Sequence, residues 1–106
     1  TVLLGDGDGS FYAALNNRVP KRPLSVAIGD ISGDGIPDLA VTKDQVAEVA
    51  VLVGKGDGSF HTPTNFKVGS SPHFVAIEDM DGDGKLDLIV ANEHSDYVTV
   101  LLNTRP

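Results

Sequence analysis

The chain repeats itself at a shift of 49 residues, and this internal repeat constrains its fold more than any other feature. When residues 1–57 are aligned with residues 50–106 without a gap, 24 of the 57 pairs are identical. Whole motifs recur: GDGSF at 7–11 returns at 56–60, and GDGIPDLAV at 33–41 returns as GDGKLDLIV at 82–90. A repeat of roughly 40–50 residues is typical of propeller blades and of helical arrays.

Short apolar runs rich in β-branched residues predict strands rather than helices. In segment 48–54, Val49, Val51 and Val53 alternate with residues that are also mostly apolar, as in a strand covered on both faces. The 12 Gly and 6 Pro residues bound such runs and disfavour long helices. We expect an all-β chain of four-stranded antiparallel propeller blades, with the strands of one complete repeat near 25–28, 38–42, 47–53 and 62–68.

The repeats divide the chain into two blades within a single domain over 1–106. They cover about 1–49 and 50–98, and a C-terminal strand at 98–103 repeats the N-terminal one. The chain is out of phase with its blades, because it opens with a third strand at 1–4 and a fourth at 12–19. This arrangement predicts one strand more than two four-stranded blades require, and the pattern does not explain the extra strand.

Each repeat carries an acidic loop of nine residues between its first two strands, at 30–38 and 79–87. Calcium takes six to eight oxygen ligands, and alternate residues of such a loop can point inward around one ion. Loop positions 1, 3, 5, 7 and 9 are therefore the expected ligands, with position 7 contributing its backbone carbonyl. These residues are Asp30, Ser32, Asp34, Ile36 and Asp38 in the first loop, and Asp79, Asp81, Asp83, Lys85 and Asp87 in the second.

The loop sequences favour two calcium ions per chain, held in loops that are not EF-hands. Gly35 and Gly84 stand at position 6, where the backbone must bend sharply. An EF-hand would need a carboxylate at position 12, but Val41 and Val90 stand there. The alternative is a pair of metal-free acidic turns, which is disfavoured because crowded carboxylates repel one another. Magnesium is disfavoured because it retains several waters. The second loop has one more carboxylate, so we expect it to bind calcium more tightly.

The acidic composition excludes several partners. The net charge of −7 repels nucleic acid and anionic membranes, and two calcium ions would reduce it to −3. The chain has no Cys, which excludes disulfides and cysteine-bound zinc. No apolar run approaches the roughly 20 residues of a membrane helix, so we expect no membrane insertion. The first 20 residues lack the basic and apolar regions of a signal peptide.

A third acidic cluster, GDGDGSF at 5–11, predicts a hairpin turn rather than a metal site. Its counterpart has Lys55 where the first copy has Asp6, and a cation is incompatible with a metal ligand position. We expect Phe11 and Phe60 to pack in the core beside these turns. The three histidines, His61, His73 and His94, fall at different repeat positions, and the pattern does not bring them together.

The motifs VLLGDGDGSF and SVAIGDISGDGIPDLAV, with their second copies, resemble the FG-GAP/VCBS repeat family over nearly the whole chain. This family forms the integrin-α-like propellers and occurs in many exported bacterial proteins. The resemblance implies blades with a calcium loop between strands one and two, ligated at the ten positions given above. It also implies a secreted or extracellular protein that binds or adheres to a carbohydrate or protein, as a lectin does.

Two blades are fewer than the six to eight that the resemblance implies, and repeat folds generally need three or more units. We therefore expect a homo-oligomer, in which three or four copies close a ring of six or eight blades. The next copy's segment 12–19 would supply the fourth strand that the last blade lacks.

The chain offers no paired acid and base and no nucleophile arrangement, so an enzyme is disfavoured. The leading interpretation is a calcium-binding module for binding or adhesion. The alternative is a structural or accessory fragment of a larger secreted protein, or an engineered or excised self-assembling fragment, with no ligand of its own.

Overall fold

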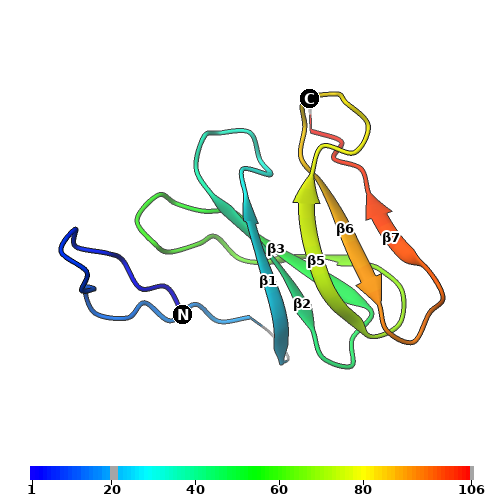
Figure 1. The fold of residues 1–106 in the computed structure, drawn as a ribbon, viewed down its shortest axis with the longest axis horizontal. Helices are drawn as coiled ribbons and strands as arrows, with labels where there is room; N and C mark the ends of the chain where they lie inside the picture. The colour runs from blue at the N-terminus through cyan, green and yellow to red at the C-terminus, as the bar shows by residue number, and fades with distance from the viewer. Residues whose placement is uncertain (20–21, 106) are drawn as a thin grey trace.

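A computed structural model describes residues 1–19 and 22–105, and within these ranges seven strands form two antiparallel sheets (Figure 1). The sheets have the orders β1-β2-β3-β4 and β5-β6-β7. Among the described residues, no helix has the length and apolar character needed to cross a membrane. The strands are β1 (Pro23–Gly29), β2 (Asp38–Lys43), β3 (Glu48–Leu52), β4 (Thr64–Lys67), β5 (Pro72–Glu78), β6 (Asp87–Asn92) and β7 (Val98–Leu101).

The predicted strands of the complete repeat are confirmed within a few residues. The expected segments near 25–28, 38–42, 47–53 and 62–68 correspond to β1, β2, β3 and β4. The two repeats also pair in the same register, because Val26 lies opposite Val41 in the first sheet and Val75 lies opposite Val90 in the second. The sequence repeat is therefore a structural repeat, and within each sheet every strand is hydrogen-bonded to its neighbour along the chain.

The first sheet has the four strands of a complete blade, and the second has three in the described residues. The chain thus holds one complete four-stranded blade and not two, and the second sheet agrees with the expectation that the last blade lacks its fourth strand. The repeat position of β4 falls beyond residue 106 in the second copy. The residues after β7 run back to the β5–β6 loop instead, where the Asn103 N–H donates to Asp87 Oδ1 at 2.8 Å.

The N-terminal segment, residues 1–19, forms an open hairpin and not the two expected strands at 1–4 and 12–19. Val2 and Leu15 make an isolated bridge, at the repeat position of Val51 and Thr64 in the β3–β4 pair. The hairpin thus keeps the register of a third and a fourth strand. Two paired segments without a sheet to extend are marginally stable, which explains why the expected strands do not form.

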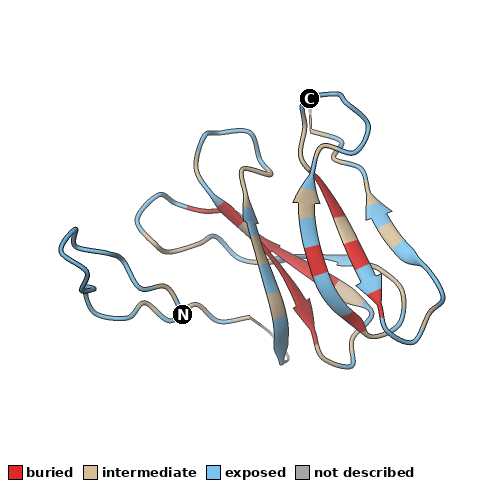
Figure 2. Cartoon of the chain, viewed as in Figure 1, coloured by how far each residue is buried: buried red, intermediate tan, exposed pale blue. Residues whose placement is uncertain are grey.

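The two sheets pack face to face through one apolar core (Figure 2). Side chains alternate across a strand, so alternate residues of the strands other than β4 point into this interface. Burying a Val or Leu side chain contributes about 1.5–3 kcal/mol, which makes this interface a main source of stability. The buried members are Ala40, Val49 and Val51 from the first sheet and Val75, Leu88 and Val90 from the second.

Each sheet has a second apolar face that the other sheet does not cover. On the first sheet Val26 and Ile28 are 57% and 67% exposed, and on the second sheet Phe74 is 69% exposed. Outer face one comprises Leu24, Val26, Ile28, Leu39, Val41 and Leu52. Outer face two comprises Phe74, Ala76, Ile89, Ala91, Val98 and Val100.

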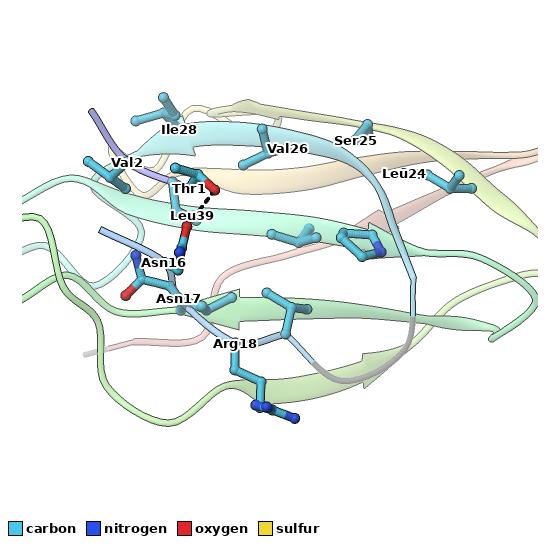
Figure 3. Close-up of a pocket in the computed structure, with 14 residues that line it drawn as sticks. Thr1, Val2, Asn16, Asn17, Arg18, Leu24, Ser25, Val26, Ile28 and Leu39 are labelled. Atoms are coloured by element: carbon cyan, nitrogen blue, oxygen red, sulfur yellow. Dashed lines mark hydrogen bonds between the residues drawn. The ribbon is translucent and has the colours of Figure 1, made fainter. Parts of the chain in front are cut away.

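A groove of about 960 Å³ lies between outer face one and the N-terminal segment. Figure 3 shows Asn16, Asn17 and Arg18 of that segment over the same face of the sheet, with Asn16 near Leu39 and all three away from β1, the strand that carries Val26 and Ile28. Outer face one is therefore only partly covered within the chain.

The two phenylalanines beside the hairpin turns have different environments. Phe60 packs against the cluster of Val41, Ala50 and Leu52, as predicted. The prediction for Phe11 is wrong, because this side chain is 60% exposed. Phe11 belongs to the N-terminal hairpin, which extends away from both sheets (Figure 1).

Candidate metal centres

The two acidic loops join β1 to β2 and β5 to β6, and both lie at the same end of the sheets (Figure 1). Each loop turns back on itself through two glycines with positive φ, at loop positions 4 and 6. These are Gly33 and Gly35, both at 82°, and Gly82 and Gly84, at 76° and 84°. L-residues rarely adopt such φ values, so the glycines allow the tight path that the carboxylates require.

The first Asp of each loop organises the backbone around its carboxylate. In the second loop Asp79 accepts N–H donors from Gly82 and Gly84, each at 2.8 Å, and from Asp83 at 3.2 Å. Asp30 in the first loop accepts the equivalent three bonds, with the Gly35 N–H at 2.8 Å. These bonds wrap each loop around its first carboxylate.

The loop carboxylates converge in both repeats. In the second loop one oxygen from each of four Asp residues lies within 4.8 Å of the others, and in the first loop three Asp residues meet the same limit. Two ligands of one calcium ion lie at most about 4.8 Å apart, since each lies at about 2.4 Å from the ion. The converging residues are Asp79, Asp81, Asp83 and Asp87, and Asp30, Asp34 and Asp38.

The closing Asp of each loop is buried and hydrogen-bonded to the backbone just after the third strand of its sheet. Asp38 and Asp87 are 0% and 1% exposed. Asp38 Oδ1 accepts the Gly54 N–H, and Asp87 Oδ1 accepts the Asn103 N–H, both at 2.8 Å. Each loop is therefore connected to the first, second and third strands. Sequence reasoning missed the roles of Gly54 and Asn103. The signal that could have found them is their shared position in the two repeats, 49 residues apart.

The carboxylates of the loops differ in their electrostatics. The backbone N–H of Gly35 is the main cause that holds the pKa of Asp30 below its usual value, and Gly84 does the same for Asp79. Asp81 behaves in the opposite way, because loss of hydration and the neighbouring Asp83 carboxylate raise its pKa. A cation in the second loop would remove this unfavourable crowding.

The remaining expected ligands lie in the same loops. The backbone N–H of Ser32 donates to Asp38 Oδ2 at 2.9 Å, which holds the first loop closed on its last residue. The Ile36 and Lys85 N–H groups donate to Asp34 and Asp83, each at 2.9 Å. Ligation by the Ser32 hydroxyl and by the carbonyls of Ile36 and Lys85 stays a prediction.

The donor set suits a hard cation. Every converging side chain offers carboxylate oxygen, and calcium binds oxygen in flexible geometry with six to eight ligands. The fit is fuller in the second loop, where Asp81 stands in place of Ser32. These residues can therefore hold calcium.

The third acidic cluster forms the predicted hairpin turn. The Asp6 N–H donates to the Ser10 carbonyl at 3.1 Å, and the Lys55 N–H makes the same bond to Ser59 at 3.0 Å. The Ser59 hydroxyl donates to Asp57 and is the main cause of that carboxyl's lowered pKa. The carboxylates of these turns are thus used locally, by their own Ser and backbone N–H groups.

The interpretation of the histidines as unrelated needs a correction. His73 and His94 both approach the same oxygen of Glu93, with Nε2 to Oε2 distances of 2.7 and 3.8 Å. All three side chains are exposed, at the end of the sheet where β6 finishes. Strand pairing brings these residues together, and their repeat positions carried no sign of it.

Two repeated antiparallel sheets, each with an acidic loop between its first two strands, define a propeller-type repeat module. The model of the FG-GAP-like repeat matches residues 30–90, which is more than half of the chain and includes both loops. The chain therefore belongs to the FG-GAP-like repeat family. No curated protein and no solved structure matches it.

Proposed function

We propose that the chain is a non-enzymatic, calcium-binding β-propeller module in which one ion stabilises each acidic loop. The observation that carries this proposal is the convergence of four Asp carboxylates in the second loop and three in the first, at the same repeat position. Family membership supports it, because FG-GAP-like repeats are generally non-enzymatic and commonly occur in extracellular proteins.

The ion supplies positive charge that the loops lack. Asp79, Asp81, Asp83 and Asp87 would hold it in the second loop, and Asp30, Ser32, Asp34 and Asp38 in the first. Because Asp38 and Asp87 begin β2 and β6 and accept N–H groups that follow β3 and β7, ordering of a loop also orders its sheet. Calcium binding therefore stabilises the folded module.

Isothermal titration calorimetry with calcium chloride tests this proposal. We expect two ions per chain, and a rise in unfolding free energy of about 2.7 kcal/mol when free calcium is 100-fold above the dissociation constant. The variants Asp34→Asn and Asp83→Asn should each abolish one site, while Asp57→Asn in the hairpin turn should retain both. Absence of calcium binding by the folded chain would refute the proposal.

Further copies of the chain cover the two outer faces. A shift of 49 residues places Val26, Ile28 and Leu39 of outer face one on Val75, Ile77 and Leu88, which lie in the buried interface between the sheets. The same shift relates outer face two to the first-sheet side of that interface. For example, Val100 of outer face two is the repeat counterpart of Val51, which lies in the interface.

Outer face two therefore corresponds in sequence to the first-sheet side of the internal interface, and outer face one corresponds to the second-sheet side. Packing outer face two of one copy on outer face one of the next would repeat the internal interface between chains. Such a head-to-tail contact generates a ring when the rotation closes, with three copies for six blades or four for eight. The next copy's segment 12–19 would then pair with the edge of β7.

Sedimentation velocity in calcium tests the assembly. We expect a trimer or tetramer that dissociates when a chelator removes calcium. A monomer at all concentrations, with two calcium ions bound, would refute the assembly and leave the calcium sites intact. Coverage of the faces by other segments of a longer protein would also give this result.

Binding or adhesion to an extracellular carbohydrate or protein is the role we propose for the assembled module. A glycan array probed with and without calcium tests it. Reproducible calcium-dependent binding supports a lectin, whereas no binding favours the structural role with no ligand of its own.

A further inference from the structure

Asn103 and Gly54 occupy the same position in the two repeats but make different contacts. In the first repeat a Cβ at Gly54 would overlap the Pro37 carbonyl oxygen, so this position accepts only glycine. In the second repeat the Asn103 side chain turns toward the equivalent carbonyl, that of Leu86, and donates to it at 2.9 Å. The same position thus has no side chain in the first repeat and a hydrogen-bonded polar side chain in the second.

The Asn103 side chain connects the two acidic loops. One N–H of its amide reaches the Ile31 carbonyl in the first loop at 2.8 Å, and the other reaches Leu86 in the second loop. Its Oδ1 accepts the Arg105 N–H at 3.0 Å. An Asn amide has two donors and one carbonyl oxygen, so every polar group of this half-buried side chain has a partner. These partners hold the side chain in one orientation.

Asn103 also contacts a predicted calcium ligand directly through its backbone. Its N–H donates to Asp87 Oδ1, while its side chain holds the carbonyl of Ile31, which lies between Asp30 and Ser32. One residue therefore touches the closing carboxylate of the second loop and the backbone beside the first ligand of the first loop.

We propose that Asn103 is a positioning residue that couples the two calcium sites, so that filling one loop strengthens binding at the other. The inference rests on the proposed calcium binding. Calcium in the second loop orders Asp87, Asp87 orders Asn103, and Asn103 orders the first loop at Ile31. Binding at the first loop then loses less conformational freedom, which makes the coupling positive. Couplings of this kind change affinity by about fivefold or more.

NMR titration of the full chain with calcium chloride measures each site separately, because the amides of Gly35 and Gly84 report the first and the second loop. Asp83→Asn disables the second loop, and we expect it to weaken calcium binding at the first loop by about fivefold. Asp34→Asn disables the first loop and should weaken the second by the same factor, since coupling between binding sites is reciprocal.

When Asn103→Ala is combined with Asp83→Asn or with Asp34→Asn, the expected weakening of about fivefold at the intact site should fall to about onefold. This variant keeps the backbone N–H to Asp87 and removes only the amide. Asn103→Gly, which carries the residue of the first repeat, is the second variant and should give the same result. A thermal unfolding curve of each variant shows that it is folded under the conditions of the titration.

The outcomes separate the inference from the proposed function. Two sites that bind independently in the unmodified chain would overturn the coupling and leave calcium binding established. Coupling that persists unchanged in both Asn103 variants would overturn the role of Asn103. Absence of binding at either loop would overturn the proposed function itself.

Discussion

Ser32 and Asp81 occupy position 3 of the two loops, and they are the one difference in carboxylate number between them. Exchange of these residues should exchange the affinities of the sites, because calcium affinity rises with the charge of its ligands. Ser32→Asp should strengthen the first site, and Asp81→Ser should weaken the second, each by roughly tenfold. Calorimetry on the single variants and on the double exchange measures this. Equal affinities in all of them would contradict the assignment of position 3 as a ligand.

Substitution of Asp81 should change the Tm in opposite directions with and without calcium. Its pKa is raised in the folded chain, so its contribution to stability is present at low pH and is lost as pH rises through that pKa. At pH 7 without calcium, Asp81→Asn should therefore raise the Tm, and this gain should disappear in acid. With calcium bound the same change removes a ligand and should lower the Tm.

Asp57→Asn is the matched control for this prediction. The pKa of Asp57 is lowered, so its contribution is present above the unfolded pKa of about 3.9 and is lost as pH falls through the folded pKa. This variant should lower the Tm at pH 7 by the same amount with and without calcium. If calcium does not reverse the effect of Asp81→Asn, then Asp81 does not ligate the ion.

At the scale of the sheet, close approach between the loop and the third strand depends on Gly54. Gly54→Ala should destabilise the chain by about 1–3 kcal/mol, because its Cβ would overlap the rigid Pro37 carbonyl. Gly5→Ala is the matched control, since Gly5 holds the same repeat position and a Cβ there meets nothing within 4 Å. Urea unfolding of both variants measures the difference. Equal losses would show that the packing against Pro37 is not the cause.

Local pattern predicted the strands and loops well where each repeat is complete. Alternating apolar residues located β1 to β4, and the spacing of Asp30, Asp34 and Asp38 predicted their convergence. The N-terminal strands could not be predicted in this way, because a strand also needs a neighbouring sheet, which residues 1–19 lack.

Contacts between the repeats were also beyond the reach of sequence pattern. The bond from Asn103 to Ile31 joins residues 72 positions apart and has no counterpart in the other repeat. Likewise, His73 and Glu93 meet only because β5 pairs with β6. Such contacts depend on how the two sheets are placed, and a repeat aligned with itself contains no information on that placement.

At the scale of the whole molecule, one residue beside the outer faces differs in character from its counterpart in the internal interface. Gly29 faces the second sheet closely, since a Cβ there would lie 3.0 Å from Ile77 Cγ2. The equivalent residue beside outer face two is the exposed Glu78. A carboxylate at this position would oppose the packing of a second copy on Ile28. The proposed contact between copies should therefore be weaker than the contact between sheets within one chain.

This difference predicts that two substitutions change self-association in opposite directions. Glu78→Gly should strengthen self-association, because it removes the charge and restores the residue of the first repeat. Ile28→Lys should abolish self-association, because it places a charge in the centre of the contact. Ile28 is 67% exposed within one chain, so this second variant should change the unfolding free energy of the dilute monomer by only about 0.5 kcal/mol. Ile77→Lys, at the equivalent half-buried position, should instead destabilise the monomer severely.

Sedimentation equilibrium of the unmodified chain and the three variants, in calcium, distinguishes these effects. The association constants should rank Glu78→Gly above the unmodified chain and Ile28→Lys below it, while only Ile77→Lys lowers the Tm of the dilute protein strongly. If Ile28→Lys assembles as well as the unmodified chain, the copies do not meet through outer face one. Any ring would then have to form through other surfaces. The proposal that copies pack on each other as the two sheets pack within one chain would be wrong.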